Sequence, residues 1–163
     1  MRNLPRIALI AFLAGGVLLF GRWGPAEEGA RAQGLAIWRG MEKALVEVPG
    51  RPAPLEVRVA DDSDERAQGM QHLPATEVRA NPIWFRFPEA RVTHWHMRNV
   101  ALALDIAWLD ASGRVLAVAR MEPGETGYRS PPDVRHALEL AAGMAERLGI
   151  RPGVSVSPPV TAE

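Results

Sequence analysis

Two histidines flank a tryptophan in the segment VTHWHMRNV, residues 92–100. In an extended strand alternate side chains point to one face, so His94 and His96 would lie about 6 to 7 Å apart on the same side. Two imidazoles at that spacing can hold one Zn²⁺ when a carboxylate joins them, and Asp105 could be that third ligand. The pattern lacks the specificity of a cysteine-rich zinc motif, and histidine is common on sheets as an amphipathic filler. We therefore predict no metal or other cofactor. His94 and His96 stay the candidate ligands if a metal is bound.

Asp105 is the more informative residue because it lies within the apolar run LALDIAWL. A carboxylate in such a strand must be paired, accept several hydrogen bonds or become neutral. Arg98 and Asn99 could supply the donors. Either Asp105 is a general base that acts with His94 or His96, or it fixes the turn that follows the histidines. We favour the structural role because no nucleophile is in view.

The usual signatures of catalysis and of nucleotide binding are missing from the sequence. Its serines lie outside any strained elbow motif, and there is no glycine-rich phosphate loop or identifiable pair of catalytic carboxylates. There is also no cysteine, which excludes disulfides and thiol catalysis. We expect that the protein is not an enzyme, and we keep Asp105 and His96 as the catalytic candidates if it is one.

A set of aromatic, thioether and polar side chains could instead form a cleft for a ligand or a protein partner. The predicted cleft consists of Met70, Trp95, His96, Arg98, Asn99, Asp105 and Tyr128. The alternative is that the methionines and aromatic residues of this set belong to the core, where such side chains are usually found.

The composition is that of an ordinary globular protein with room for one domain. The chain has 163 residues, of which 47% are hydrophobic and 23% are charged, and its formal net charge is zero. Residues 1–32 hold four arginines and two glutamates, so the remainder carries a net charge of −2. Such a surface gives no electrostatic reason to bind nucleic acid, and we expect no nucleic-acid partner.

The N-terminus has the pattern of an export signal. Arg2 and Arg6 precede an apolar run of 14 residues, IALIAFLAGGVLLF, which is shorter than the ~20 residues that a comfortable membrane span needs. The sequence Ala-Arg-Ala at residues 30–32 offers a cleavage site. We predict that residues 1–32 are a signal peptide or an N-terminal membrane anchor attached through residues 7–20. In both cases the rest of the protein is exported, and is either periplasmic or anchored to the inner membrane facing the periplasm.

The remaining sequence predicts short strands joined by turns, with few helices. Residues 33–54 are interpreted as a linker with a short amphipathic segment, which could be some helix or an added strand. Strands are predicted at residues 55–60, 83–87, 91–97, 102–109, 115–121 and 151–156. Helices are predicted at residues 62–69, capped by Asp62 or Ser63, and at residues 141–149.

Two hairpins are expected, one across residues 88–90 and one across residues 110–114. The predicted fold class is mostly β, of the α+β kind: a compact, small, barrel-like antiparallel or mixed sheet with two short helices. This sheet would form a single domain at residues 55–157, followed by a tail at residues 158–163.

Five segments carry a resemblance to a known protein family. They are VADDSDERAQGM, FRFPEARVTHWHMRNV, ALDIAWLDASGRVLAV, YRSPPDVRHALELAAGMAERLGI and RPGVSV, and they cover roughly residues 55–156. In these segments the chain resembles the domain of unknown function 192, DUF192. The resemblance implies a small, mostly-β, barrel-like domain that is often exported and has no established biochemical activity.

Within the histidine segment the resemblance to this family is partial. Met97 and Asn99 match its pattern, and Arg98 preserves a positive charge. His94 and His96 stand where the family has serine and tryptophan, so the histidines are this protein's own variation. The other residues on family-typical positions are Asp105, Tyr128, Ser130, Arg135 and Glu139.

We therefore expect an exported small β-barrel domain that binds a ligand or a protein partner in the cell envelope. Two alternatives stay open. One is a small envelope hydrolase or lyase that uses Asp105 with His94 or His96. The other is an accessory subunit of a membrane complex.

Overall fold

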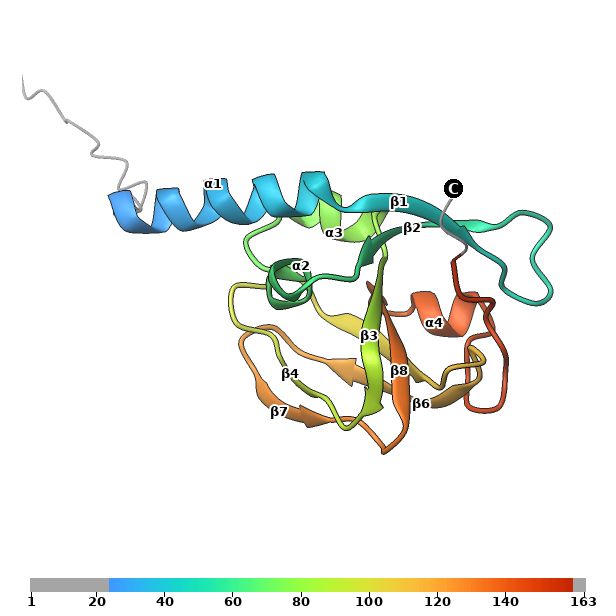
Figure 1. Cartoon of the computed structure of the whole chain (residues 1–163). Coiled ribbons are helices and arrows are strands. Elements are labelled where there is room, and N and C mark those ends of the chain that lie inside the picture. Colours follow the sequence, from blue (N-terminus) through green and yellow to red (C-terminus); the bar gives the residue numbers. More distant parts are fainter. Residues whose placement is uncertain (1–23, 160–163) are drawn as a thin grey trace, which may run out of the picture.

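The structure is a computed structural model that describes residues 24–159 (Figure 1). The apolar run at residues 7–20, predicted as a signal or anchor, lies outside the described residues, as does most of the predicted tail. None of the described helices is long and apolar enough to cross a membrane.

Within the described residues, strands form a six-stranded sheet and a two-stranded sheet. The strands are β1 (Glu42–Val46), β2 (Leu55–Ala60), β3 (Ile83–Arg91), β4 (His94–His96), β5 (Leu104–Leu109), β6 (Val115–Met121), β7 (Thr126–Arg129) and β8 (Val134–Ala141). The main sheet has the order β1-β2-β3-β8-β5-β6, and its pairs are antiparallel except for the parallel pair of β2 and β3. β4 pairs with β7 in the second sheet. The helices are α1 (Pro25–Gly40), α2 (Ser63–Gln68), α3 (Ala75–Ala80) and α4 (Met144–Arg147).

The predicted class, mostly β of the α+β kind with a mixed sheet, is confirmed. The expected barrel-like closure is wrong, because β1 and β6 are the two edges of the described main sheet and do not pair with each other. The expected number of helices is also too low, since α1 and α3 add to the two that were predicted. α3 has only six residues, too few for a helical period to show in the sequence.

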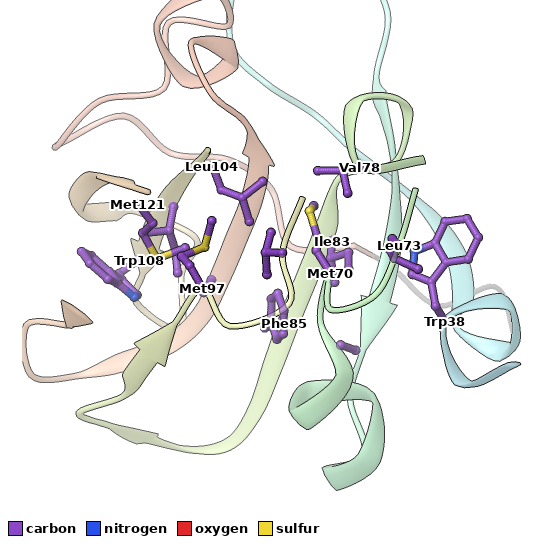
Figure 2. Close-up of a cluster of buried hydrophobic side chains, with 14 of the residues drawn as sticks. Trp38, Met70, Leu73, Val78, Ile83, Phe85, Met97, Leu104, Trp108 and Met121 are labelled. Atoms are coloured by element: carbon purple, nitrogen blue, oxygen red, sulfur yellow. The ribbon is translucent and has the colours of Figure 1, made fainter. Parts of the chain in front are cut away.

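The central strands of the main sheet are buried on both faces, because one core lies on each side. Alternate side chains of these strands enter alternate cores. Phe85 and Ile106 enter the first core, which also holds Met70 and side chains of α3 (Figure 2). Trp84 and Leu138 enter the second core, which includes side chains of α4 and of the C-terminal segment. This two-sided burial explains the nearly continuous apolar runs of the central strands.

The segment at residues 33–54 contributes both a helix end and an added strand to the structure. β1 pairs with β2 along its whole length. Trp38, near the end of α1, is buried, and the guanidinium carbon of Arg58 lies 3.9 Å from the centre of its ring. Gly34 permits the close approach of α1 to α2, since a Cβ there would lie 2.5 Å from Oε1 of Gln68. The main sheet therefore begins before residue 55.

One of the two predicted hairpins is confirmed. β5 and β6 pair with each other across residues 110–114. The other hairpin is wrong, because β3 continues through residues 88–90 and β4 pairs with β7, with Trp95 opposite Tyr128. β7 supplies these backbone partners, although no strand was predicted at residues 126–129, because the glycine and proline residues of this stretch are typical of a loop.

Asp105 anchors α4 to the main sheet. Its Oδ1 accepts a 2.6 Å hydrogen bond from Nε of Arg120, and its Oδ2 accepts a 3.0 Å hydrogen bond from the N–H of Ala145. The prediction that Arg98 and Asn99 donate to Asp105 is wrong, because the donors are Arg120 and Ala145. Asp105 alternates with residues of the first core and so points to the second, whereas the segment after β4 packs against the first.

Replacing Asp105 with alanine should loosen α4. The buried N–H of Ala145 would lose its acceptor, and Arg120, whose side chain is half exposed, would be rehydrated. We expect the free energy of unfolding of D105A, measured with urea, to fall by about 2 kcal/mol. The control E89A, at an exposed position of β3, should stay within about 0.5 kcal/mol of the wild type. An unchanged unfolding midpoint in D105A would contradict the anchoring role.

Candidate functional site

A pocket of about 180 Å³ lies between α2, β4 and the face of the main sheet that carries the first core. Its lining comes from the end of α2 and the residues after it, and from β3, β4 and β8. The lining residues are Arg66, Ala67, Gln68, Gly69, Met70, Gln71, Phe85, His94, Trp95, His96, Val100 and Glu139. We call it the Glu139 pocket.

Glu139 is the buried carboxyl group of this pocket. It lies on β8 between Ile83 of β3 and Ile106 of β5, and it is 5% exposed. Its Oε2 is buried and has no hydrogen-bond partner among the described residues. Burial raises the pKa of the Glu139 carboxyl to about 8, because a low-dielectric environment disfavours the charged form. Most of the unliganded protein therefore holds this carboxyl protonated at pH 7.

Gly69 brings the end of α2 close to Glu139. It follows the last residue of the helix and has a φ of +45°, a conformation that side-chain-bearing residues rarely adopt. A Cβ at this position would lie 3.6 Å from Oε2 of Glu139 and 3.5 Å from Cζ of Phe85. A larger residue would therefore strain the backbone and place its side chain against the carboxyl group.

β4 brings both histidines to the pocket, although not as the regular pair that the strand pattern predicts. The pairing of β4 with β7 shifts register between Trp95 and His96, which interrupts the alternation of the strand. His94 is exposed, whereas His96 is half-buried and its Nδ1 is buried without a hydrogen-bond partner. Burial, and then the charge of Arg98, hold the pKa of His96 below its usual value. The His96 ring is therefore neutral at pH 7.

Aromatic rings form a wall of the pocket. The ring of Trp95 meets that of Phe85 edge to face, with 4.8 Å between the centroids and an interplanar angle of 87°. Phe87 lies on the same side, 6.3 Å from Trp95. The indole nitrogen of Trp95 donates a 2.7 Å hydrogen bond to Oγ1 of Thr93, which fixes the ring and leaves its apolar surface for the pocket.

The candidate metal ligands do not come together in the described part of the chain. Among residues 24–159, no three histidine, aspartate or glutamate side chains are grouped closely enough to hold a metal ion. Asp105, the expected third ligand, points to the second core, whereas His94 and His96 line a pocket on the other face of the main sheet.

Comparison with known proteins identifies the family. Residues 44–158 match the family model DUF192, which is described as "Uncharacterized ACR, COG1430". The chain belongs to the DUF192 family. The resemblance carried by the five sequence segments is therefore confirmed.

Two solved structures resemble this DUF192 protein. One is a protein of Sinorhizobium meliloti 1021 that bears the provisional name of transcription regulator. The two structures have a TM-score of 0.65 and 28% sequence identity, and the match covers 72% of this chain and 94% of that one. The other is a protein of unknown function from Novosphingobium aromaticivorans, with a TM-score of 0.64 and 29% identity, over 73% of this chain and 87% of that one. No curated protein matches the chain significantly.

The structure brings three of the seven predicted cleft residues together in the DUF192 domain. Met70, Trp95 and His96 line the Glu139 pocket. Asp105 lines a different hollow, of about 410 Å³, beside α4. Both oxygens of Asp105 already accept hydrogen bonds, so this carboxyl group has no unpaired oxygen for a ligand in that hollow.

The other three predicted residues lie outside the pocket. Arg98 is exposed. Asn99 lines a separate hollow, and its carbonyl oxygen accepts a 2.7 Å hydrogen bond from the N–H of His72. Tyr128 pairs with β4, but its hydroxyl donates to the carboxylate of Glu125 and accepts from a backbone N–H.

Sequence reasoning missed Glu139 and Phe85 as residues of the site. The signal for Glu139 was present, because it stands between two leucines in the run ALEL. This is the same pattern, a carboxylate within an apolar strand, that singled out Asp105. No comparable signal exists for Phe85, which reads as an ordinary core residue of β3.

Glu139 should make the protein less stable as the pH rises. The pKa of this carboxyl is about 8 in the folded protein and 4.5 in the absence of burial. Between these values the folded state keeps a proton that the unfolded state has lost, so the free energy of unfolding falls as the pH approaches 8. Between the two pKa values, each pH unit lowers the free energy of unfolding by about 1.4 kcal/mol. The whole decline between pH 4.5 and pH 8 therefore amounts to several kcal/mol.

We expect E139M to lack this decline. At pH 7 it should exceed the wild type in stability by about 1–3 kcal/mol, because it removes an unpaired polar group from the interior. Urea unfolding of the wild type, E139M and the exposed-site control E89Q between pH 5 and pH 8.5 measures the effect, with E89Q following the wild type. A difference between the wild type and E139M that does not vary with pH would contradict the titration of Glu139.

Proposed function

We propose that this DUF192 protein is a binding module of the cell envelope and that the Glu139 pocket receives its ligand. One observation carries the proposal: Oε2 of Glu139 is buried beside a pocket and has no partner among the described residues. Polar atoms in the interior of a protein normally have a hydrogen-bond partner. An unpaired one in a concave site supports a role in binding.

The composition of the pocket also supports ligand binding. Small-molecule sites are mostly apolar and aromatic, with a few polar groups that fix orientation. Here Phe85, Trp95 and Met70 give the apolar surface, and Glu139 and His96 give the polar groups. Burial of an unpaired carboxyl group costs stability, and proteins retain such costly residues where function uses them.

Export of the protein is part of the proposal. Its support is the basic and then apolar pattern at the N-terminus. Residues 24–33 are exposed, and Gly34 is the first buried residue of α1. Cleavage after Ala32 would therefore remove no buried side chain of the described residues, while an uncleaved anchor would hold the domain through a helix that projects beyond the sheet (Figure 1). The second case corresponds to an accessory subunit of a membrane complex.

A second candidate function is acid–base catalysis in the same pocket. Glu139 and His96 line it together, and burial moves the pKa of the first up and of the second down. Two groups with pKa values on either side of neutrality suit a general acid and a general base. The hydrolase or lyase alternative would accordingly use Glu139 in place of Asp105, which is engaged by Arg120 and by α4.

The provisional name of the Sinorhizobium meliloti relative raises transcription as another role. The composition of this chain argues against it. Acidic and basic residues are equal in number, at 19 each, and sequence-independent attraction to DNA requires an excess of basic side chains.

The proposal predicts the state of the protein in its own cells. N-terminal sequencing of material recovered from the cell envelope should find the chain starting at Gln33, or intact and bound to the membrane. Native mass spectrometry of the same material should show a retained small molecule or a protein partner.

The E139M variant should lose a small-molecule ligand, while the control variant E89Q should keep it. A protein found in the cytoplasm, or always bare and monomeric, would contradict the proposal.

A further inference from the structure

We propose that the Glu139 pocket binds a primary alkylammonium group, with the ammonium beside Glu139 and the alkyl chain against Phe85 and Trp95. This inference rests on the binding function proposed above and adds the chemical class of the ligand. It follows from four properties of the pocket: its hydrogen-bond donors, its aromatic wall, its charges and its size.

The amide and indole donors of the pocket already have acceptors. The amide nitrogen of Gln68 donates to the carbonyl oxygen of Gln71, and the amide nitrogen of Gln71 donates to a carbonyl oxygen of α2. The indole nitrogen of Trp95 donates to Thr93. Two buried groups of the pocket have no partner among the described residues: Oε2 of Glu139, an acceptor when the carboxyl is ionised, and Nδ1 of His96, an acceptor when the ring proton is on Nε2. A ligand that satisfies this pocket therefore brings a donor rather than an acceptor.

An ammonium group is the donor that also resolves the cost of the buried charge. An isolated carboxylate in the interior is unfavourable, but a carboxylate paired with a cation is largely compensated. Phe85 and Trp95 line the pocket and pack edge to face, and an aromatic ring attracts a cation to its free face. A neutral alcohol could donate a hydrogen bond to Glu139, but it would gain neither of these electrostatic terms.

The charged and titratable groups around Glu139 permit a cationic ligand. α2 contributes Arg66, and β4 contributes His94 and His96, while Phe85 of β3 is uncharged. His96 is neutral at pH 7. One terminal nitrogen of Arg66 donates to two backbone carbonyl oxygens, those of Asp61 and Arg86.

Acidic residues lie next to Arg66 in the chain. The segment DDSDER, residues 61–66, carries four carboxylates and one arginine. Asp61 and Asp62 precede α2, and Asp64 and Glu65 lie in its first turn. These carboxylates offset the positive charge of Arg66, most strongly at low ionic strength, where screening is weak.

The volume of about 180 Å³ limits the ligand to a short chain. Drug-sized molecules need several hundred cubic ångströms. The same chemistry is available from a free small amine and from the aminoalkyl end of a larger molecule, such as a lysine side chain.

Titration of the full-length protein with n-butylammonium, followed by NMR at the N–H of Gly69 and the indole N–H of Trp95, tests the inference. Butyrate and n-butanol are the anionic and neutral probes of the same length. We expect n-butylammonium to bind at least tenfold more tightly than either, E139Q to lose this preference, and E89Q to keep it.

The affinity should also depend on pH. Because the ammonium binds the ionised carboxyl, and the competent fraction rises as the pH passes 8, binding should tighten roughly 20-fold between pH 6.5 and pH 8.5. The probe itself stays charged, since amines such as the lysine side chain have a pKa of about 10.4. Nα-acetyl-lysinamide, whose side-chain ammonium is free, then separates the two sources of the ligand. If it binds more tightly than n-butylammonium, the ligand is the end of a larger molecule. If it binds more weakly, the ligand is a free amine.

The outcomes separate this inference from the proposed function. If butyrate or n-butanol shifts the same resonances as tightly as n-butylammonium, the pocket binds ligands but the ammonium inference is overturned. The same holds if E139Q binds n-butylammonium as the wild type does. If none of the probes shifts these resonances, and the protein recovered from cells is bare, both the inference and the proposed function are overturned.

Discussion

Burial on both faces of β3, β8 and β5 decides the environment of every polar side chain that these strands carry. Glu139 lies opposite Ile106 in the register of β8 and β5, and Asp105 is the next residue along. Because side chains alternate, that one step places the two carboxyl groups on opposite faces of the sheet. Each then meets a different core, with different partners.

The two carboxyl groups differ in how their burial is compensated. Asp105 receives a guanidinium N–H from Arg120 and a backbone N–H from α4, so it stabilises the junction of helix and sheet. Glu139 faces aromatic and aliphatic side chains, and its Oε2 has no partner among the described residues. The first arrangement is complete without a ligand. The second leaves an acceptor oxygen without a partner among the described residues, which is why the functional proposal rests on Glu139.

The Glu139 pocket depends on two local irregularities that bring separate elements together. The positive φ of Gly69 ends α2 against Glu139 and Phe85, and the register shift in β4 turns His96 toward the same place. Sequence patterns predicted α2 with a cap at Asp62 or Ser63, of which the structure has Asp62, and they predicted most strands and one hairpin. They missed the pairing of β4 with β7, because pairing between distant strands is not encoded in local periodicity.

The sequence by itself determined the fold class, the family and the presence of one carboxylate, Asp105, within an apolar strand, because these follow from local patterning and from motifs in order. It also marked Met70, Trp95 and His96 as residues of a site. Only the tertiary structure decided that Glu139, and not Asp105, joins them. The physical reason is that the face a strand residue occupies, and the donors it meets there, depend on register and on which elements cover each face. Those contacts join residues far apart in the chain, and no local segment specifies them.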